Sequence, residues 1–119
     1  MLKLMYITND PAVANIAADA GVDRIFIDME VLGKAERQDG MDTVQSHHTP
    51  EDIAKVRAAI GDQAEIMARV NPLNPNSQRE IDDAIANGAD VIMLPMWRTA
   101  DDLRQLVHMV NGRAKVMPL

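Results

Sequence analysis

The sequence contains no cysteine and very few aromatic side chains: 3% of its 119 residues, namely Tyr6, Phe26 and Trp97, are aromatic. The absence of cysteine excludes disulfides, thiolate nucleophiles and thiolate metal sites. Three aromatic residues are too few for the stacking platforms on which single-stranded nucleic acids bind. Apolar runs of about 18 residues, which a membrane-spanning helix requires, are missing as well.

The charge balance is acidic, because 18 aspartate and glutamate residues outnumber 12 lysine and arginine residues and give a formal net charge of −6. A negative surface repels phosphate backbones and anionic lipids, so we expect neither nucleic acid nor a membrane as a partner. Hydrophobic residues make up 47% of the chain, which is typical of a folded globular protein. We expect one domain, residues 1–119, with one core and a cytoplasmic location.

Short apolar runs alternate with segments in which apolar residues recur three and four positions apart. The first pattern is typical of buried strands and the second of amphipathic helices, so the sequence predicts an α/β fold in the order βαβαβαβαβ. Several runs are apolar on both faces, as in parallel strands that helices cover. The five predicted strands comprise residues 2–8, 22–29, 64–71, 90–96 and 114–119.

Each of the four predicted helices is closely followed by a glycine, as α/β folds with short connections require. Three of them have clear amino-terminal caps, which are Asp10 or Asn9, Thr49 and Thr99. For the third helix we expect a capping box formed by Ser77 and Glu80. Helical spacing places Ile16 in the buried stripe of the first helix and Val107 in that of the fourth.

One long polar stretch, residues 31–48, follows the second predicted strand, where α/β proteins commonly place a functional loop. It carries Gly33 and Gly40 and ends in the adjacent pair His47 and His48. One of these histidines is a candidate for catalysis or ligand binding. Alternatively, both are solvated or help to begin the next helix.

The carboxyl ends of parallel strands lie at one edge of a sheet, and ligands bind there. Residues two apart in a strand point to the same side, so Asp28 shares a side with Glu30, and Arg69 shares one with Asn71. We therefore take the polar and turn residues at these strand ends as candidates for catalysis or substrate binding. They are Asp28 and Glu30 after the second strand, Arg69 and Asn71 after the third, and Pro95 and Met96 after the fourth.

Two interpretations of the charged strand ends are open. Arg69 offers a planar fork for an anionic oxygen ligand, and Asp28 and Glu30 could hold that arginine or a hard cation in place. Alternatively, Asp28 and Arg69 form an ordinary buried ion pair without a ligand.

Three segments resemble the HpcH/HpaI aldolase and citrate lyase beta-subunit family, and the resemblance runs through the whole chain in order. They are Asp28-Met29-Glu30, Ala68-Arg69-Val70-Asn71-Pro72, and the strand from Gly88 through Pro95-Met96. The family adopts a TIM barrel of the phosphoenolpyruvate and pyruvate superfamily. It makes or breaks carbon–carbon bonds next to the enolate of a 2-oxo acid or an acyl thioester, with a divalent metal such as Mg²⁺ or Mn²⁺.

This resemblance implies a role for each charged residue. Arg69 resembles the arginine that contacts the substrate carbonyl and stabilises enolate charge, as such fixed charges do in many enzymes. Asp28 and Glu30 resemble the acids that support the metal site and orient the arginine. Where the aldolase branch commonly has a histidine after the glutamate, this chain has Val31, so its acid–base role is vacant or passes to His47 or His48.

The length is the second departure from the family. A complete TIM barrel needs about 250 residues, so the sequence predicts the amino-terminal half of a barrel, with about five strands and four helices. The metal ligands of the family would come from beyond Leu119. We expect an inactive, truncated fragment of a larger enzyme, or a half barrel that pairs with another copy as a homo-oligomer and covers its bare edge strands.

Two other classes of function remain to be weighed against the lyase. One is a non-catalytic half barrel that serves binding or assembly. The other is a flavodoxin-like receiver domain, since about 120 residues with five alternating strands suit that fold too. The receiver pattern is poorly matched, because Arg69 ends the third strand where the phospho-accepting aspartate would stand.

Overall fold

The computed structural model describes residues 2–32 and 48–119. In these two ranges five strands alternate with four helices, and the predicted α/β fold is confirmed. In chain order the elements are β1 (Met5–Ile7), α1 (Pro11–Asp19), β2 (Arg24–Asp28), α3 (Pro50–Ile60), β3 (Glu65–Arg69), α4 (Ser77–Ala86), β4 (Val91–Leu94), α5 (Ala100–Val110) and β5 (Lys115–Pro118). Every strand is shorter than the range predicted for it.

All five strands are parallel, and each pairs with the next along the chain in the order β1-β2-β3-β4-β5. Sequential pairing of this kind is the arrangement of a (β/α) barrel. A flavodoxin-like sheet would have the order 2-1-3-4-5 and helices on both faces. The alternative of a receiver-type domain is therefore wrong for this chain.

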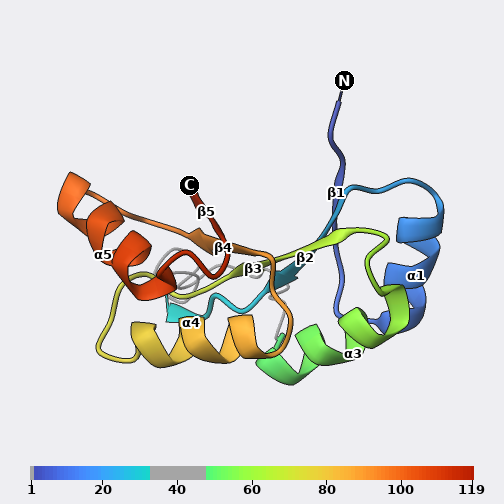
Figure 1. Cartoon of the computed structure of the whole chain (residues 1–119), viewed down its shortest axis with the longest axis horizontal. Helices are drawn as coiled ribbons and strands as arrows, with labels where there is room; N and C mark the ends of the chain where they lie inside the picture. The colour runs from blue at the N-terminus through green and yellow to red at the C-terminus, as the bar shows by residue number, and fades with distance from the viewer. Residues whose placement is uncertain (1, 33–47) are drawn as a thin grey trace, which may run out of the picture.

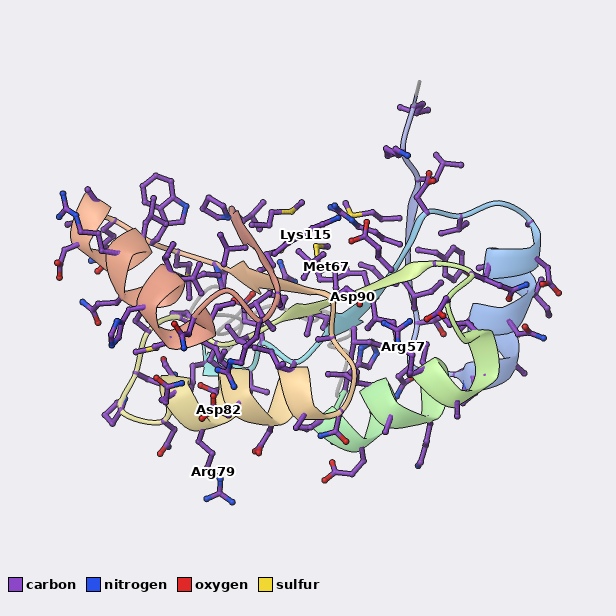
Figure 2. All side chains as sticks on the ribbon, viewed as in Figure 1. Arg57, Met67, Arg79, Asp82, Asp90 and Lys115 are labelled. Carbon is purple, nitrogen blue, oxygen red and sulfur yellow. The ribbon has the colours of Figure 1, made fainter. Side chains whose placement is uncertain are left out.

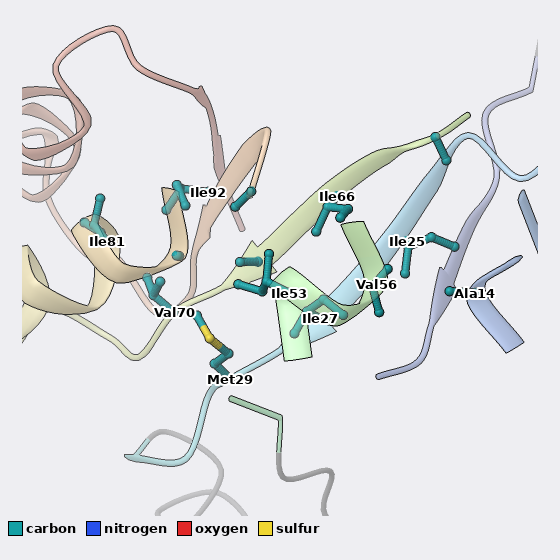
Figure 3. Packing of buried hydrophobic residues seen from close by; sticks show 14 of the residues in the cluster. Ala14, Ile25, Ile27, Met29, Ile53, Val56, Ile66, Val70, Ile81 and Ile92 are labelled. Atoms are coloured by element: carbon teal, nitrogen blue, oxygen red, sulfur yellow. The ribbon is translucent and has the colours of Figure 1, made fainter. Parts of the chain in front are cut away.

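The helices surround one side of the curved sheet, with α1 and α5 at its two ends and α3 and α4 between them (Figure 1). The main core lies between the sheet and these helices (Figure 3). Ile25 and Ile27 of β2, Ile66 of β3 and Ile92 of β4 point into it and are fully buried.

A second, smaller apolar cluster lies on the helix-free face of the sheet. Because side chains alternate along a strand, the residues between those of the main core point to this face. The cluster contains Phe26, Met67, Val91 and Met93, with Met117 packed against it. This face would form the interior of a closed barrel.

The two ends of the sheet are exposed in this chain. All three residues of β1 are about half exposed, and Val116 of β5 is 38% exposed. The predicted burial of Ile16 and Val107 is wrong: they are 69% and 56% exposed. Both residues lie on α1 and α5, the outermost of the described helices, which pack mainly against α3 and α4 respectively.

Local caps explain where most helices begin. The Asp10 carboxylate accepts hydrogen bonds from the backbone N–H groups of Ala12 and Val13 at the start of α1. At α5, Thr99 and Asp102 cap each other's backbone. Hydrogen bonds from the backbone N–H groups of Arg98 and Thr99 hold the pKa of the Asp102 carboxyl below its usual value.

The capping box predicted for the third helix is wrong. The residue before α4 is Asn76, and the Ser77 hydroxyl accepts a hydrogen bond from the backbone N–H of Asn74. The Glu80 carboxylate binds the side-chain amides of Asn71 and Asn74 in place of the backbone. The local pattern was consistent with a box, but a tertiary partner, Asn71, competes for the carboxylate.

Candidate functional site

Asp28 and Arg69 lie side by side because of the register of the sheet. β2 and β3 pair so that Asp28, the last residue of β2, is opposite Arg69, the last residue of β3. Both lie two residues beyond members of the cluster on the helix-free face, so their side chains leave the sheet on that face. The geometry thus places a carboxylate and a guanidinium at the carboxyl end of the sheet, as predicted.

The Arg69 guanidinium contacts two carboxylates. Its Nε and Nη2 donate to Oδ1 and Oδ2 of Asp28 at 3.0 and 2.7 Å, which is a bidentate pair. Its Nε also lies 3.0 Å from Oε2 of Glu30. Asp28 and Glu30 are 3% and 0% exposed, so water does not solvate their carboxylates well, and the positive charge of Arg69 helps to stabilise them. Hydrogen bonding to Asp28, aided by the charge of both acids, raises the pKa of Arg69 despite its burial.

Further contacts fix the geometry of this charged group. The Arg69 guanidinium carbon lies 5.3 Å from the centre of the Phe26 ring, a cation–π contact. Oδ1 of Asp28 also accepts a hydrogen bond from the backbone N–H of Glu30 at 3.2 Å. Sequence reasoning missed Phe26, although its position two residues before Asp28 in the same strand was the available signal.

Part of the guanidinium remains open to a ligand. Within residues 2–32 and 48–119, the hydrogen bonds of the Arg69 guanidinium use Nε and Nη2, and none involves Nη1. The Arg69 side chain is 17% exposed. An amino group with two N–H donors at the end of the sheet can therefore bind an anionic oxygen.

His48 joins this region through the backbone. Its Nδ1 accepts a hydrogen bond from the backbone N–H of Asp28 at 2.8 Å, so the ring proton of a neutral His48 resides on Nε2. β1 ends at Ile7, which pairs with Phe26, and so provides no strand partner for Asp28. The imidazole supplies the missing acceptor. His47, Gly33 and Gly40 lie outside the described residues.

His48 also lines a depression of about 360 Å³ between the beginnings of α3 and α4. Its other lining residues are Met29, Thr49, Pro50, Asn76, Arg79, Glu80 and Asp83. The depression lies beside the Asp28 backbone, on the helix side of the sheet. It does not include Arg69.

Asn71 is engaged with backbone and with Glu80. Its Oδ1 accepts hydrogen bonds from the backbone N–H groups of Val31 and Leu32 at 2.7 and 2.9 Å, and its Nδ2 donates to Glu80. The structure thus places this predicted substrate-binding residue two positions beyond Arg69, holding the chain that leaves β2. Sequence reasoning assigned Glu80 to a helix cap and so missed this contact.

Pro95 and Met96 follow β4 at the same end of the sheet, one strand beyond Arg69. Pro95 is buried and Met96 is half-buried. Met96 has a positive φ of 53°, a strained conformation for a residue with a side chain. Among the described residues, no hydrogen bond or ion pair joins either of them to Arg69, and their role in substrate binding stays a prediction.

A divalent metal does not fit the residues that the structure describes. Residues 2–32 and 48–119 contain no group of three or more histidine or acidic side chains arranged to hold a metal ion. Asp28 and Glu30, the acids nearest to such a role, both face Arg69. Among the described helices, none is long and apolar enough to cross a membrane.

Comparison with known proteins gives the family that the chain resembles. The family model for the HpcH/HpaI aldolase/citrate lyase family matches residues 3–116. Among curated proteins, none matches the chain significantly.

Solved structures show the fold. The HpcH/HpaI aldolase from Desulfitobacterium hafniense DCB-2 superposes with a TM-score of 0.65 at 16% identity, over 88% of this chain and 36% of that one. Phosphoribosyl anthranilate isomerase from Thermotoga maritima has a TM-score of 0.65 at 13% identity, over 99% and 50%. Macrophomate synthase has a TM-score of 0.56 at 18% identity, over 88% and 31%. The chain thus spans about a third to a half of these structures, and the predicted partial barrel is confirmed.

Proposed function

The chain belongs to the HpcH/HpaI aldolase/citrate lyase family, and we propose that its Arg69 site serves carbon–carbon bond cleavage or formation next to an enolate. The substrate would be a small 2-oxo acid aldol or an acyl thioester. One observation carries the proposal: a nearly buried guanidinium, held by two carboxylates, presents Nη1 at the carboxyl end of the sheet.

The geometry suits an oxyanion that develops during the reaction. When the carbon–carbon bond of an aldol breaks, a base takes the hydroxyl proton and the bonding electrons form an enolate on the 2-oxo acid. Arg69 would stabilise the negative oxygen of that enolate through Nη1. Because Asp28 and Glu30 already hold the guanidinium, little reorganisation is needed at the moment of reaction.

His48 has a supporting role in this proposal. Its bond to the backbone N–H of Asp28 keeps the end of β2 in place. As an acid–base group it would act through Nε2, and that role remains a prediction.

A divalent metal, Mg²⁺ or Mn²⁺, remains a proposal for the complete enzyme. It would act as a Lewis acid on the substrate oxygen. Since the described residues provide no cluster of metal ligands, those ligands would have to come from elsewhere. For the same reason we propose that the 119-residue chain does not turn over substrate by itself.

Arg69→Lys in the complete enzyme tests the role of Arg69. Lysine keeps the charge but loses the planar fork, and we expect kcat to fall about 100-fold or more, as when one oxyanion donor is removed. Pyruvate release from a 4-hydroxy-2-oxo acid with Mg²⁺ or Mn²⁺ measures it. The matched control is Arg79→Lys, since Arg79 is 86% exposed on α4 and projects away from the protein (Figure 2).

Three outcomes would count against the proposal. Equal turnover in Arg69→Lys and Arg79→Lys would remove Arg69 from the reaction. Turnover by the 119-residue chain alone would contradict the need for further residues. Absence of lyase activity in every form would favour the second candidate, a non-catalytic assembly module that pairs with another copy through the exposed edge strands β1 and β5.

A further inference from the structure

We propose that Asn71 is a positioning residue: it holds the backbone immediately after Glu30 and thereby fixes the carboxylate that contacts Arg69. The importance of this contact for catalysis rests on the proposed function, but the positioning itself does not.

The Asn71 side chain has no lone pair left for a ligand. Its Oδ1 accepts two hydrogen bonds from consecutive backbone N–H groups, at 2.7 Å from Val31 and 2.9 Å from Leu32. A carbonyl oxygen has two lone pairs, and both are used. Oδ1 of Asn71 therefore binds backbone, and substrate binding by this residue stays a prediction.

Glu80 sets the orientation of the Asn71 amide. A carboxylate can only accept hydrogen bonds, so it must face Nδ2, and Oδ1 is then directed at the two backbone N–H groups. A flipped amide would place its NH₂ against two N–H donors and its oxygen against a carboxylate. Asn74 in turn fixes Glu80, because its Nδ2 donates to the second carboxylate oxygen at 2.9 Å.

The hydrogen bonds of Asn71 are connected to Arg69 through the peptide unit between Glu30 and Val31. Val31 directly follows Glu30, whose side chain is 0% exposed and lies 3.0 Å from Nε of Arg69. Holding the N–H groups of Val31 and Leu32 restricts the backbone torsions on the carboxyl side of Glu30. The first turn of α4 is thus coupled to the guanidinium across β3.

Two NMR readouts on the purified chain test the proposal without any need for turnover. The first is amide hydrogen exchange at Val31 and Leu32, and the second is the chemical shift of the Arg69 Nε–H signal. In Asn71→Leu, which is nearly isosteric, we expect exchange at both amides to become about tenfold faster, as loss of a hydrogen bond implies. We also expect the Arg69 signal to move. The matched control is Asn87→Leu at the far end of α4, where Asn87 binds a helix carbonyl.

A rescue variant distinguishes the network from general damage. Asn71→Asp combined with Glu80→Gln reverses the polarity of one hydrogen bond: Asp accepts from the backbone and from Gln, while the Gln oxygen still accepts from Asn74. We expect this double variant to restore slow exchange and the Arg69 signal, whereas Asn71→Asp alone places two carboxylates together and does not. Glu80→Gln alone is a milder change that tests the network even if Asn71→Leu does not fold, with a smaller change expected in both readouts.

Unchanged exchange at Val31 and Leu32 in the variants would overturn the proposal. Faster exchange with an unmoved Arg69 signal would also overturn it, because Asn71 would then anchor the chain without positioning Glu30 and Arg69. A failure of lyase activity would leave both readouts as they are, so the two hypotheses fail separately.

Discussion

Two arginines hold the two ends of the sheet, and they do so with different partners. Arg69, at the ends of the strands, contacts the two buried carboxylates of Asp28 and Glu30. Arg57, on α3, lies at the beginnings of the strands beside Asp90 (Figure 2). Its Nη1 donates to the carbonyl of Gly61 at 2.7 Å, and its Nη2 donates to the carbonyl of Gly88 at 2.8 Å and to Asp90.

The partners of Arg57 are the groups that a fold must satisfy. The carbonyls of Gly61 and Gly88 follow the ends of α3 and α4, where helices leave acceptors without internal donors. Asp90 also accepts from the backbone N–H of Ile66, which links the beginnings of β3 and β4. Arg57 therefore joins two helix ends and two strands, as a structural residue does.

The difference teaches how to recognise a site residue among buried ion pairs. Both amino groups of Arg57 donate hydrogen bonds to the protein itself. In Arg69, Nε and Nη2 donate to Asp28, and Nη1 makes no hydrogen bond to the described residues. A larger hollow, about 680 Å³, lies beside Arg57 and Asp90. Size alone would thus favour the end of the sheet opposite the proposed site, whereas barrel enzymes place their chemistry at the carboxyl ends of the strands.

Arg69→Met should have the largest effect on stability. It removes the guanidinium that contacts Asp28 and Glu30, which are 3% and 0% exposed. We expect the free energy of unfolding at pH 7 to fall by about 3 kcal/mol, the scale of a broken buried ion pair. Urea unfolding at pH 7 measures it, with Arg79→Met on the exposed side of α4 as the control. Equal losses in the two variants would contradict the explanation.

Arg57→Met should have a smaller effect on stability and none on the chemistry of Arg69. Asp90 is 41% exposed on its side chain, so water can solvate its charge once Arg57 is gone. We expect a loss of about 2 kcal/mol from hydrogen bonds to a charged group, with the Arg69 Nε–H signal unmoved. A shift of that signal would contradict the inference that Arg57 and Arg69 act independently at the two ends of the sheet.

The smallest expected effect is a difference in stability between two glycine-to-alanine variants. Gly88 has φ +114°, and a Cβ there would lie 3.3 Å from Cγ and Nε of Arg57. Gly112 has φ +73°, and a Cβ there would meet nothing within 4 Å. Both alanine variants carry backbone strain, so we expect Gly88→Ala to lose about 1 kcal/mol more than Gly112→Ala by crowding Arg57. In an Arg57→Met background the difference should decrease, and an unchanged difference would contradict the crowding.

Much of the fold could be predicted from the sequence because its signals are local. Apolar runs, caps such as Asp10 and Thr99, and a glycine after each helix defined the alternation of strands and helices. The failures came where a distant partner intervened. The Glu80 carboxylate binds Asn71 and does not form the expected capping box. Ile16 is exposed because α1 lies at the edge of the described helices (Figure 1).

The candidate site was predicted only in part. Alternation along a strand placed Asp28 with Glu30, and Arg69 with Asn71, on shared sides. That Asp28 stands opposite Arg69 depends on the register between β2 and β3, which no local pattern encodes. The structural role of Arg57 was not predicted from the sequence, although its position one turn before Gly61 was the available signal.

The sequence by itself determined the repeating α/β order, the positions of the helix ends and the charged residues at the strand ends, since each depends on near neighbours along the chain. The tertiary structure decided which of those charges meet. Parallel strands bring together residues about 40 positions apart, and only the register of the sheet pairs Asp28 with Arg69 through Nε and Nη2. The same tertiary contacts direct Asn71 to the backbone after Glu30, because its hydrogen-bonding groups are satisfied by whichever donors and acceptors the fold brings within reach.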